Sequence, residues 1–157
     1  MQSFIPPILF LTAVIISLSG CLAEPVGEPI TINGVTVPPM PSIAPEIITQ
    51  GEELYAQYCA GCHGADLGGA PDWKQRLPDG SFPPPPQDST GHTWHHLDKL
   101  LINMIKEGGD PDLGGVMPPF GDKLSEEEIV AILDFIKSNF KKKEREFQWW
   151  VTVTKVK

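Results

Sequence analysis

Two cysteines and a histidine within five residues constrain this chain more than any other feature of its sequence. The run CAGCH, residues 59–63, places the thiols of Cys59 and Cys62 three positions apart and the imidazole of His63 directly after the second thiol. A disulfide between the two cysteines would close too small a loop to stabilise a fold much. The pair therefore has another use, which depends on the compartment and on the rest of the fold.

The amino-terminal residues predict export. Residues 1–20 carry no charged side chain and form an apolar segment that is somewhat short for a membrane span, which needs about 20 apolar residues. The basic residues usual at the start of a signal peptide are missing, but Leu18-Ser19-Gly20-Cys21 resembles a bacterial lipobox, in which the cysteine is lipidated and becomes the new amino terminus. We expect a lipoprotein signal peptide over residues 1–20 and a lipid on Cys21, with an uncleaved transmembrane anchor or a buried cysteine as alternatives. The remainder is then expected at the cell membrane, on its periplasmic or extracytoplasmic side.

Length and charge narrow the classes further. The 157 residues suffice for one compact domain plus tails, since single domains usually run about 100 to 150 residues. The net charge of −8 argues against nucleic-acid binding as the main activity. Residues 46–136 hold sixteen acidic and five basic side chains, a balance of −11, whereas residues 137–157 hold two acidic and seven basic ones, a balance of +5. Such asymmetry is expected to orient partners, although a run of charge is often only a solvated face.

Residues 21–45 are rich in proline and predict an extended tether. Within the tether, residues 30–37 alternate around Asn33-Gly34, the pair that best tolerates the positive φ angles of a two-residue hairpin turn. An isolated hairpin is marginally stable in water, so this one is expected to dock on another part of the protein.

Three helices are predicted in the remainder, over residues 49–59, 93–106 and 125–140. The first opens with a capping box at Thr49 to Glu52 and the third with one at Ser125 to Glu128, while Gly108 is the expected stop of the second. A loop as long as residues 64–92 is unusual in a small domain unless it wraps around something. Short helices joined by such loops cannot enclose a core by themselves, so a large apolar group is missing. The apolar faces comprise Leu54, Tyr55 and Tyr58, then Trp94, Leu97, Leu101, Met104 and Ile105, then Ile129, Ile132, Leu133, Ile136 and Phe140.

A haem would supply that apolar mass. At a helix end, Cys59 and Cys62 lie about one turn apart on the same side, where each thiol can add to one vinyl group of the porphyrin. His63 can then bind the iron as an axial ligand. We therefore expect one covalently bound haem c.

Three alternatives to haem attachment exist for the CAGCH motif. A thioredoxin-like pair would need a strand before the motif and a helix after it, and the glycine-rich sequence after His63 predicts no helix. A zinc site would need two further ligands, available only as the scattered His92, His95 and His96. Chance occurrence of the motif is the third alternative.

Over about residues 49–140 the chain resembles the class I cytochrome c family. Three stretches carry the resemblance: GEELYAQYCAGCHG, HHLDKLLINMIKEG and VMPPFGDKLSEEEIVAILDFIKSNF. It implies an all-α domain over residues 46–140, with three main helices and long loops around one covalent haem. It also implies that Cys59 and Cys62 hold the haem, that His63 is the proximal ligand, and that the methionine before proline, Met117, is the distal ligand.

The chemistry of Met117 agrees with that role, because a soft thioether suits haem iron and Pro118 and Pro119 stiffen the loop that presents it. Met104, a histidine and an open site remain alternatives, and core filling is the expected role of Met104. The family's proximal histidine donates a hydrogen bond near a proline, but residues 83–86 are all proline and leave that partner unassigned.

The family also packs a glycine and an aromatic residue of its first helix against the last helix, and Gly51 and Tyr55 match these two positions. His92 and His96 are four residues apart and could share a helix face, which leaves a second metal as an alternative. We expect instead a helix start with polar and haem-edge contacts, with Trp94 near the porphyrin.

With both axial positions filled, the resemblance implies an electron carrier rather than an enzyme: a membrane-anchored cytochrome that passes single electrons between respiratory or photosynthetic donor and acceptor proteins. A peripheral cytochrome subunit of a larger membrane oxidoreductase, such as alternative complex III, is the alternative. A ligand sensor or peroxidase in which the Met117 bond breaks comes third.

The basic and aromatic tail, residues 141–157, lies beyond the part that the resemblance covers. Its alternating residues 149–156 predict a strand, preceded by charged residues. Such a strand could pair with residues 30–37, extend the sheet of a partner, or lie at the membrane interface.

Overall fold

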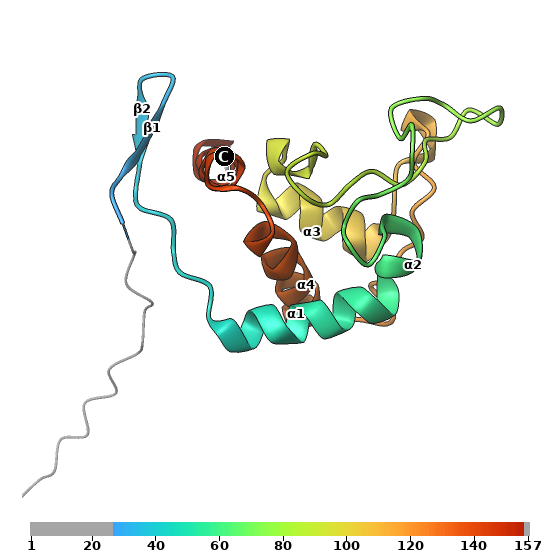
Figure 1. Cartoon of the computed structure of the whole chain (residues 1–157), viewed down its shortest axis with the longest axis horizontal. Helices are drawn as coiled ribbons and strands as arrows, with labels where there is room; N and C mark the ends of the chain where they lie inside the picture. The colour runs from blue at the N-terminus through green and yellow to red at the C-terminus, as the bar shows by residue number, and fades with distance from the viewer. Residues whose placement is uncertain (1–26, 156–157) are drawn as a thin grey trace, which may run out of the picture.

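The computed structural model describes residues 27–155; the predicted signal peptide and the predicted lipidation of Cys21 lie outside this part of the chain. Among the described residues, no helix has both the length and the apolar character needed to cross a membrane. The described chain is mostly helical, with one small hairpin (Figure 1). Its elements are β1 (Ile30–Ile32), β2 (Val35–Val37), α1 (Pro45–Tyr58), α2 (Ala60–His63), α3 (Asp98–Glu107), α4 (Glu126–Ser138) and α5 (Lys142–Lys155), with 3-10 turns η1 (Thr93–His95) and η2 (Pro111–Leu113).

The crossing of α1 over α4 forms the centre of the core. Gly51 is buried there, and a Cβ atom at this position would lie 2.7 Å from the carbonyl carbon of Ala131 and 2.8 Å from Cβ of Phe135. One turn later, the buried ring of Tyr55 packs against Phe135, with the ring centroids 5.3 Å apart. The predicted glycine and aromatic contact with the last helix is therefore confirmed. The α4 side of the core is the predicted stripe of Ile129, Ile132, Leu133 and Ile136, with Phe140 buried beyond the end of the helix.

The amino-terminal end of α1 differs from the prediction. The helix begins at Pro45, and Thr49 lies inside it, where its hydroxyl donates to the carbonyl oxygen of Pro45 at 3.1 Å. The predicted capping box at Thr49 to Glu52 is therefore wrong. Proline at the first helical position has the required φ angle and lacks the amide that would be unpaired, so the helix starts one turn earlier without a side-chain cap.

The predicted capping box of α4 is confirmed. The Ser125 hydroxyl accepts from the Glu128 amide at 3.2 Å, and the Glu128 carboxylate accepts from the Ser125 amide at 2.8 Å. This exchange satisfies two amides that the first helical turn leaves unpaired.

The second predicted helix is shorter than expected. Residues 93–95 form the 3-10 turn η1, His96 is extended (φ −107°, ψ 148°), and α3 begins only at Asp98. Contacts with α5 hold this break open, because Gln148 donates to the His96 carbonyl at 3.2 Å and the Asp98 amide donates to the Thr152 hydroxyl at 3.0 Å. The predicted stop is confirmed, since Gly108 caps α3 with a φ of 92°.

The predicted hairpin at residues 30–37 is confirmed, whereas the strand predicted for residues 149–156 is wrong. Asn33 and Gly34 have φ angles of 51° and 75°, and β1 pairs with β2 in antiparallel register. Residues 149–155 instead belong to α5, which lies beside the hairpin (Figure 1). Tertiary packing overrides the β-branched alternation, because Gln148 (1% exposed) and Val151 (2% exposed), three positions apart on a helix, share its buried face.

The long loop between α2 and α3 is irregular but well connected. Arg76 stacks over the ring of Phe82 at 4.3 Å and donates to the carbonyls of Gly80 and Leu113. The Phe82 amide also donates to the Gly114 carbonyl at 3.0 Å. These bonds attach the outer part of this loop to the loop that carries Met117.

Candidate haem-binding site

The cysteines of CAGCH lie on one turn of helix. Cys59 links the end of α1 to the start of α2, and its carbonyl oxygen accepts from the amides of Cys62 at 3.1 Å and His63 at 3.0 Å. Both thiols are free; Cys59 is buried and Cys62 is exposed. Gly64, with a φ of 80°, ends this turn. Two thiols one turn apart, one inside and one at the surface, suit attachment of a flat apolar group lying at the edge of the core.

The electrostatics of Cys59 argue against a reactive redox pair. Burial, with a smaller contribution from Cys62, raises the pKa of the Cys59 thiol to about 11. The thiol is therefore protonated at neutral pH. Thioredoxin-like cysteines need the opposite shift, because the thiolate is the nucleophile.

His63 is held by a backbone carbonyl. Its Nδ1 lies 2.8 Å from the carbonyl oxygen of Pro85, which selects one proline from the four in residues 83–86. Burial lowers the pKa of the imidazole, although the bond to Pro85 acts in the opposite direction. A neutral ring that donates its Nδ1–H to Pro85 has its Nε2 lone pair free for a metal.

Glycines allow the proline run to approach His63. A Cβ atom at Gly69 would lie 2.9 Å from the Pro84 carbonyl oxygen, and one at Gly91 would lie 2.9 Å from the Pro86 carbonyl carbon. Gly69 also has a φ of 66°, in the left-handed region. These glycines fix the path of residues 84–86 and with it the carbonyl that His63 uses.

Gln87 is a further member of the site that the sequence did not reveal. Its side-chain amide nitrogen lies 3.1 Å from His63 Nδ1, and its amide oxygen accepts from the Thr93 hydroxyl at 2.9 Å. If the Gln87 amide is rotated so that its oxygen and nitrogen exchange places, the oxygen accepts from His63 Nδ1–H and the nitrogen donates to the Thr93 hydroxyl. Nδ1 then keeps its proton. The only signal in the sequence is that Gln87 directly follows the proline run.

Met117 lies in a loop tied to the end of α3. Its carbonyl oxygen accepts from the Gly109 amide at 2.9 Å, and the Phe120 amide donates to the Ile105 carbonyl at 3.0 Å. Met117 is partly buried against the hydrophobic cluster that also contains Cys59 and Phe120. The predicted distal ligand and the first predicted attachment cysteine therefore contact the same cluster.

Met104, the alternative ligand, is 38% exposed, whereas Leu101 and Ile105 of the same helix are buried. The predicted core-filling role of Met104 is therefore wrong. The buried face of α3, which packs on α4, is formed by Leu101 and Ile105, and Met104 lies beside that face.

The histidines at 92–96 form an aromatic stack. His92 lies flat against Trp73, with centroids 5.2 Å apart, and meets His96 edge-on at 5.4 Å. Burial, followed by the neighbouring histidines, lowers the pKa of both imidazoles. Within residues 27–155, no group of three or more His, Cys, Asp or Glu side chains could hold a metal ion. Trp94 packs against Phe147 of α5, with centroids 5.6 Å apart.

The residues fit a covalently bound haem. Two free thiols lie one turn apart, the neighbouring imidazole is oriented through Nδ1, and a thioether lies against the same cluster as the buried thiol. His63, the thiols of Cys59 and Cys62, and Met117 could each make the bond that the sequence predicts for them.

Comparison with known proteins agrees with this fit. The family described as cytochrome C oxidase, cbb3-type, subunit III matches residues 46–136. The quinohemoprotein alcohol dehydrogenase ADH IIB of Pseudomonas putida is 28% identical over 127 residues, which cover 79% of this chain and 16% of that relative. The chain thus spans about one sixth of the length of that dehydrogenase.

Proposed function

Since the chain belongs to the class I cytochrome c family, we propose that it is a membrane-anchored one-haem cytochrome that carries single electrons between a donor and an acceptor protein. Haem-based electron transfer is the general activity of such a domain. Bound haem c would supply a one-electron couple between ferric and ferrous iron. The chain itself would supply attachment, axial ligands and a surface for partners.

The proposed roles follow the site geometry. Cys59 and Cys62 form thioether bonds, His63 binds iron through Nε2, and Met117 is the distal ligand. The contact between His63 Nδ1 and the Pro85 carbonyl oxygen supports this assignment most strongly, because it orients a neutral imidazole next to two thiols on one helical turn.

Exposed apolar residues beside Met117 are suited to brief contacts with redox partners. Val116 is 64% exposed and Leu113 is 69% exposed, although both are large hydrophobic residues. Exposed apolar patches commonly mark interaction sites. The acidic balance of residues 46–136 favours partners with a basic surface, since complementary charge accelerates encounter.

A first experiment tests the haem and its ligands. The full chain, expressed with a c-type haem attachment system, is expected to give a pyridine haemochrome spectrum and a mass increased by one haem. Cys59→Ser with Cys62→Ser should lose covalent haem, and Met117→Ala should lose the long-wavelength ferric band of a methionine–iron bond and bind carbon monoxide. Carbon monoxide binding by the unsubstituted protein would favour the sensor or peroxidase instead.

The second candidate function is that of a subunit in a larger membrane oxidoreductase. The family match is described as an oxidase subunit, and the similar dehydrogenase is several times longer than this chain. Residues 27–45 and 137–155, outside the family match, pack on one another and add a surface that an assembly could use. Co-purification with integral membrane subunits would support this role, and a free species would support the carrier.

Anchoring through Cys21 is proposed from the lipobox-like sequence LSGC. Metabolic labelling with a radioactive fatty acid is expected to label the protein and to fail for Cys21→Ser. Labelling that persists in this variant would contradict lipidation at Cys21.

A further inference from the structure

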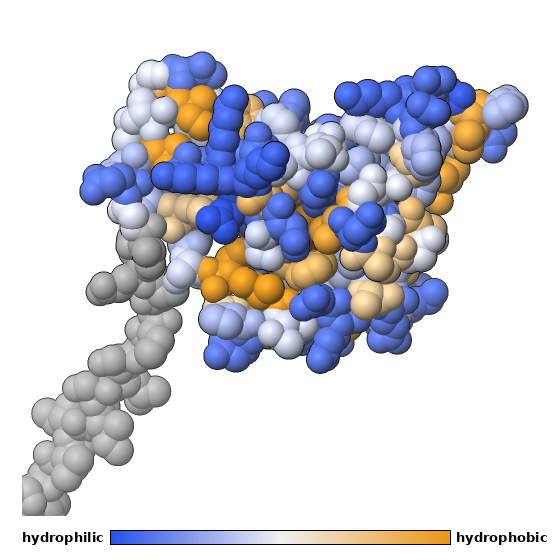
Figure 2. Space-filling view, viewed as in Figure 1, coloured by the Kyte–Doolittle hydropathy of each residue, from blue (hydrophilic) through white to orange (hydrophobic). Residues whose placement is uncertain are grey.

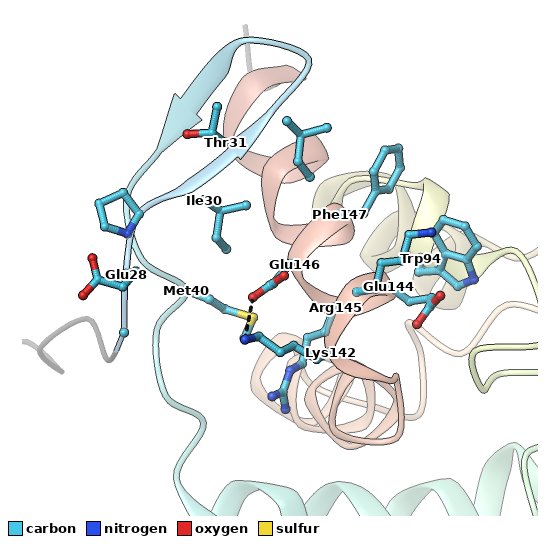
Figure 3. A pocket seen from close by; sticks show the side chains of 14 residues that line it. Glu28, Ile30, Thr31, Met40, Trp94, Lys142, Glu144, Arg145, Glu146 and Phe147 are labelled. Atoms are coloured by element: carbon cyan, nitrogen blue, oxygen red, sulfur yellow. Dashed lines mark ion pairs between the residues drawn. The ribbon is translucent and has the colours of Figure 1, made fainter.

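A groove of about 850 Å³ separates the hairpin from the first half of α5 (Figure 3). Apolar side chains contribute to its lining from both sides, with Ile30 on the hairpin and, across the groove, Phe147 of α5 next to Trp94. Charged side chains of both signs border it: Lys142, Lys143, Arg145, Glu28, Glu144 and Glu146. The groove therefore combines an apolar floor with a rim that carries three basic and three acidic groups, next to the exposed lysines at the start of α5.

The hairpin is fixed on α5 by two indole hydrogen bonds. Trp149 donates to the Pro38 carbonyl at 2.9 Å, and Trp150 donates to the Val35 carbonyl at 3.1 Å. These bonds turn most of the predicted tether into part of the folded domain. The groove itself is lined by Gly27, the first described residue, so the described chain begins at this groove.

Docking of the hairpin on α5 shortens the free part of the predicted tether, residues 21–45. Cys21 precedes Gly27 by six positions, which span roughly 20 Å when fully extended. Free residues 21–45 would span about 80 Å. A lipid on Cys21 would thus keep the groove close to the bilayer surface.

Three consecutive lysines lie at the start of α5, next to the groove. Residues 141–143 are all lysine and all exposed, and the Lys142 side chain, 84% exposed, has only a 3.8 Å ion pair with Glu146. An exposed ion pair of this length neutralises little. Positive charge at the start of a helix opposes the helix dipole, so these lysines do not serve the stability of α5.

Figure 2 shows both kinds of surface on this side of the molecule, where strongly hydrophilic residues lie next to apolar ones over the hairpin and α5.

We propose that residues 141–143 and the adjoining groove bind the headgroups of anionic phospholipids, so that the start of α5 faces the bilayer. Three exposed lysines beside an apolar groove match the order of charge and hydrocarbon at a membrane surface. The −11 balance of residues 46–136 would repel the rest of the domain from such a surface, which fixes the orientation. The inference rests on the proposed membrane anchoring for its setting but needs no haem.

Lysine labelling tests the proposal on the full chain. The purified protein is reconstituted into vesicles of phosphatidylcholine alone or with phosphatidylglycerol, and the acetylation rate of each lysine is measured by mass spectrometry. Labelling of residues 141–143 should slow about fivefold or more in the anionic vesicles and recover in high salt. Lys106 and Lys123, exposed near the Met117 loop, are the internal controls and should not change.

Variants give an independent measurement. The triple variant Lys141→Gln, Lys142→Gln, Lys143→Gln should lose the difference in tryptophan quenching by brominated lipid between anionic and neutral vesicles. Lys106→Gln with Lys123→Gln should retain it. Circular dichroism checks that both variants are folded.

Three outcomes would overturn the proposal. Equal labelling of residues 141–143 in the two kinds of vesicle is the first, and equal slowing of Lys106 and Lys123 is the second. Protection that requires an added acidic membrane protein is the third, because it assigns the surface to a protein. Haem content of the same samples is measured separately, so loss of haem with lysine protection intact would count against the proposed function alone.

Discussion

The imidazole Nδ1 of His63 lies 2.8 Å from the carbonyl oxygen of Pro85, twenty-two positions further along the chain. This bond joins the CAGCH turn to the long loop and leaves Nε2 free for the proposed iron. Gln87 and Thr93 extend the contact toward η1. The loop that wraps the site therefore also orients its proposed iron ligand.

Gly91→Ala tests this arrangement. The added methyl group would overlap the Pro86 carbonyl, so residues 85 and 86 must shift and the His63 bond should weaken. We expect a loss of about 1–3 kcal/mol in the free energy of unfolding and a higher reduction potential, since a weaker bond makes the imidazole a poorer donor to iron. Denaturant unfolding and redox titration measure the two effects.

Gly61→Ala is the matched control, because a Cβ atom there would meet nothing within 4 Å. Gly61 lies in the CAGCH motif, in α2, and Gly61→Ala should be neutral or slightly stabilising. An unchanged reduction potential in Gly91→Ala would contradict the role assigned to the Pro85 carbonyl.

Gly51→Ala should disrupt the crossing of α1 and α4. The methyl group would be pressed against the backbone of Ala131, which cannot rotate away as a side chain can. Overpacking of this kind costs about 1–3 kcal/mol or more, measured by denaturant unfolding. Gln50→Ala, an exposed neighbour, is the control, and comparable stabilities of the two variants would argue against close packing at Gly51.

Replacing Trp149 and Trp150, whose indoles donate to the hairpin, by phenylalanine tests the docking of the hairpin. Trp149→Phe with Trp150→Phe removes the two bonds to the Pro38 and Val35 carbonyls, each contributing about 0.5–1.5 kcal/mol. Amide hydrogen exchange in residues 30–37 should accelerate while exchange in α4 stays slow. Trp73→Phe, in the loop near His92, should leave the hairpin protected.

The pair of His92 and His96 should make the haem-free chain sensitive to acid. Their pKa values are lowered from the ordinary 6.5, mainly by burial, so the unfolded chain binds more protons just below that pH. The free energy of unfolding should therefore be highest above about pH 6.5 and decline as the pH falls toward the pKa values of the two histidines in the folded chain. His92→Gln with His96→Gln should flatten this part of the pH profile of the denaturation midpoint, and an unchanged slope would contradict the assignment.

Val116→Lys tests the proposed partner surface. A positive charge in an apolar contact beside Met117 should slow electron transfer with a native membrane partner by about tenfold, because it also repels the expected basic surface, while the absorption spectrum stays unchanged. Val35→Lys, at another exposed valine, on the hairpin, is the control. Equal rates for Val116→Lys and the unsubstituted protein would place the electron-transfer contact elsewhere.

Features that depend on neighbouring residues were predictable. The turn at Asn33-Gly34, the capping box of Ser125 and Glu128, and the stop at Gly108 all arise from backbone angles or hydrogen bonds within a few positions. The sequence failed where a local pattern competed with packing. Thr49 resembled a cap but lies inside α1, and the alternation after Trp149 belongs to a helix that buries Gln148 and Val151.

The sequence by itself determined that two thiols and an imidazole share one helical turn, because a spacing of three or four residues is one turn wherever a helix forms. Only the tertiary structure decided that Pro85, among four consecutive prolines, accepts the bond from His63, and that α5 packs on the hairpin. The physical reason is the separation of the interacting residues along the chain. Spacing within one helical turn is fixed by the backbone. The choice among distant partners depends instead on which chain segments can pack together without overlap, as Gly69 and Gly91 allow here.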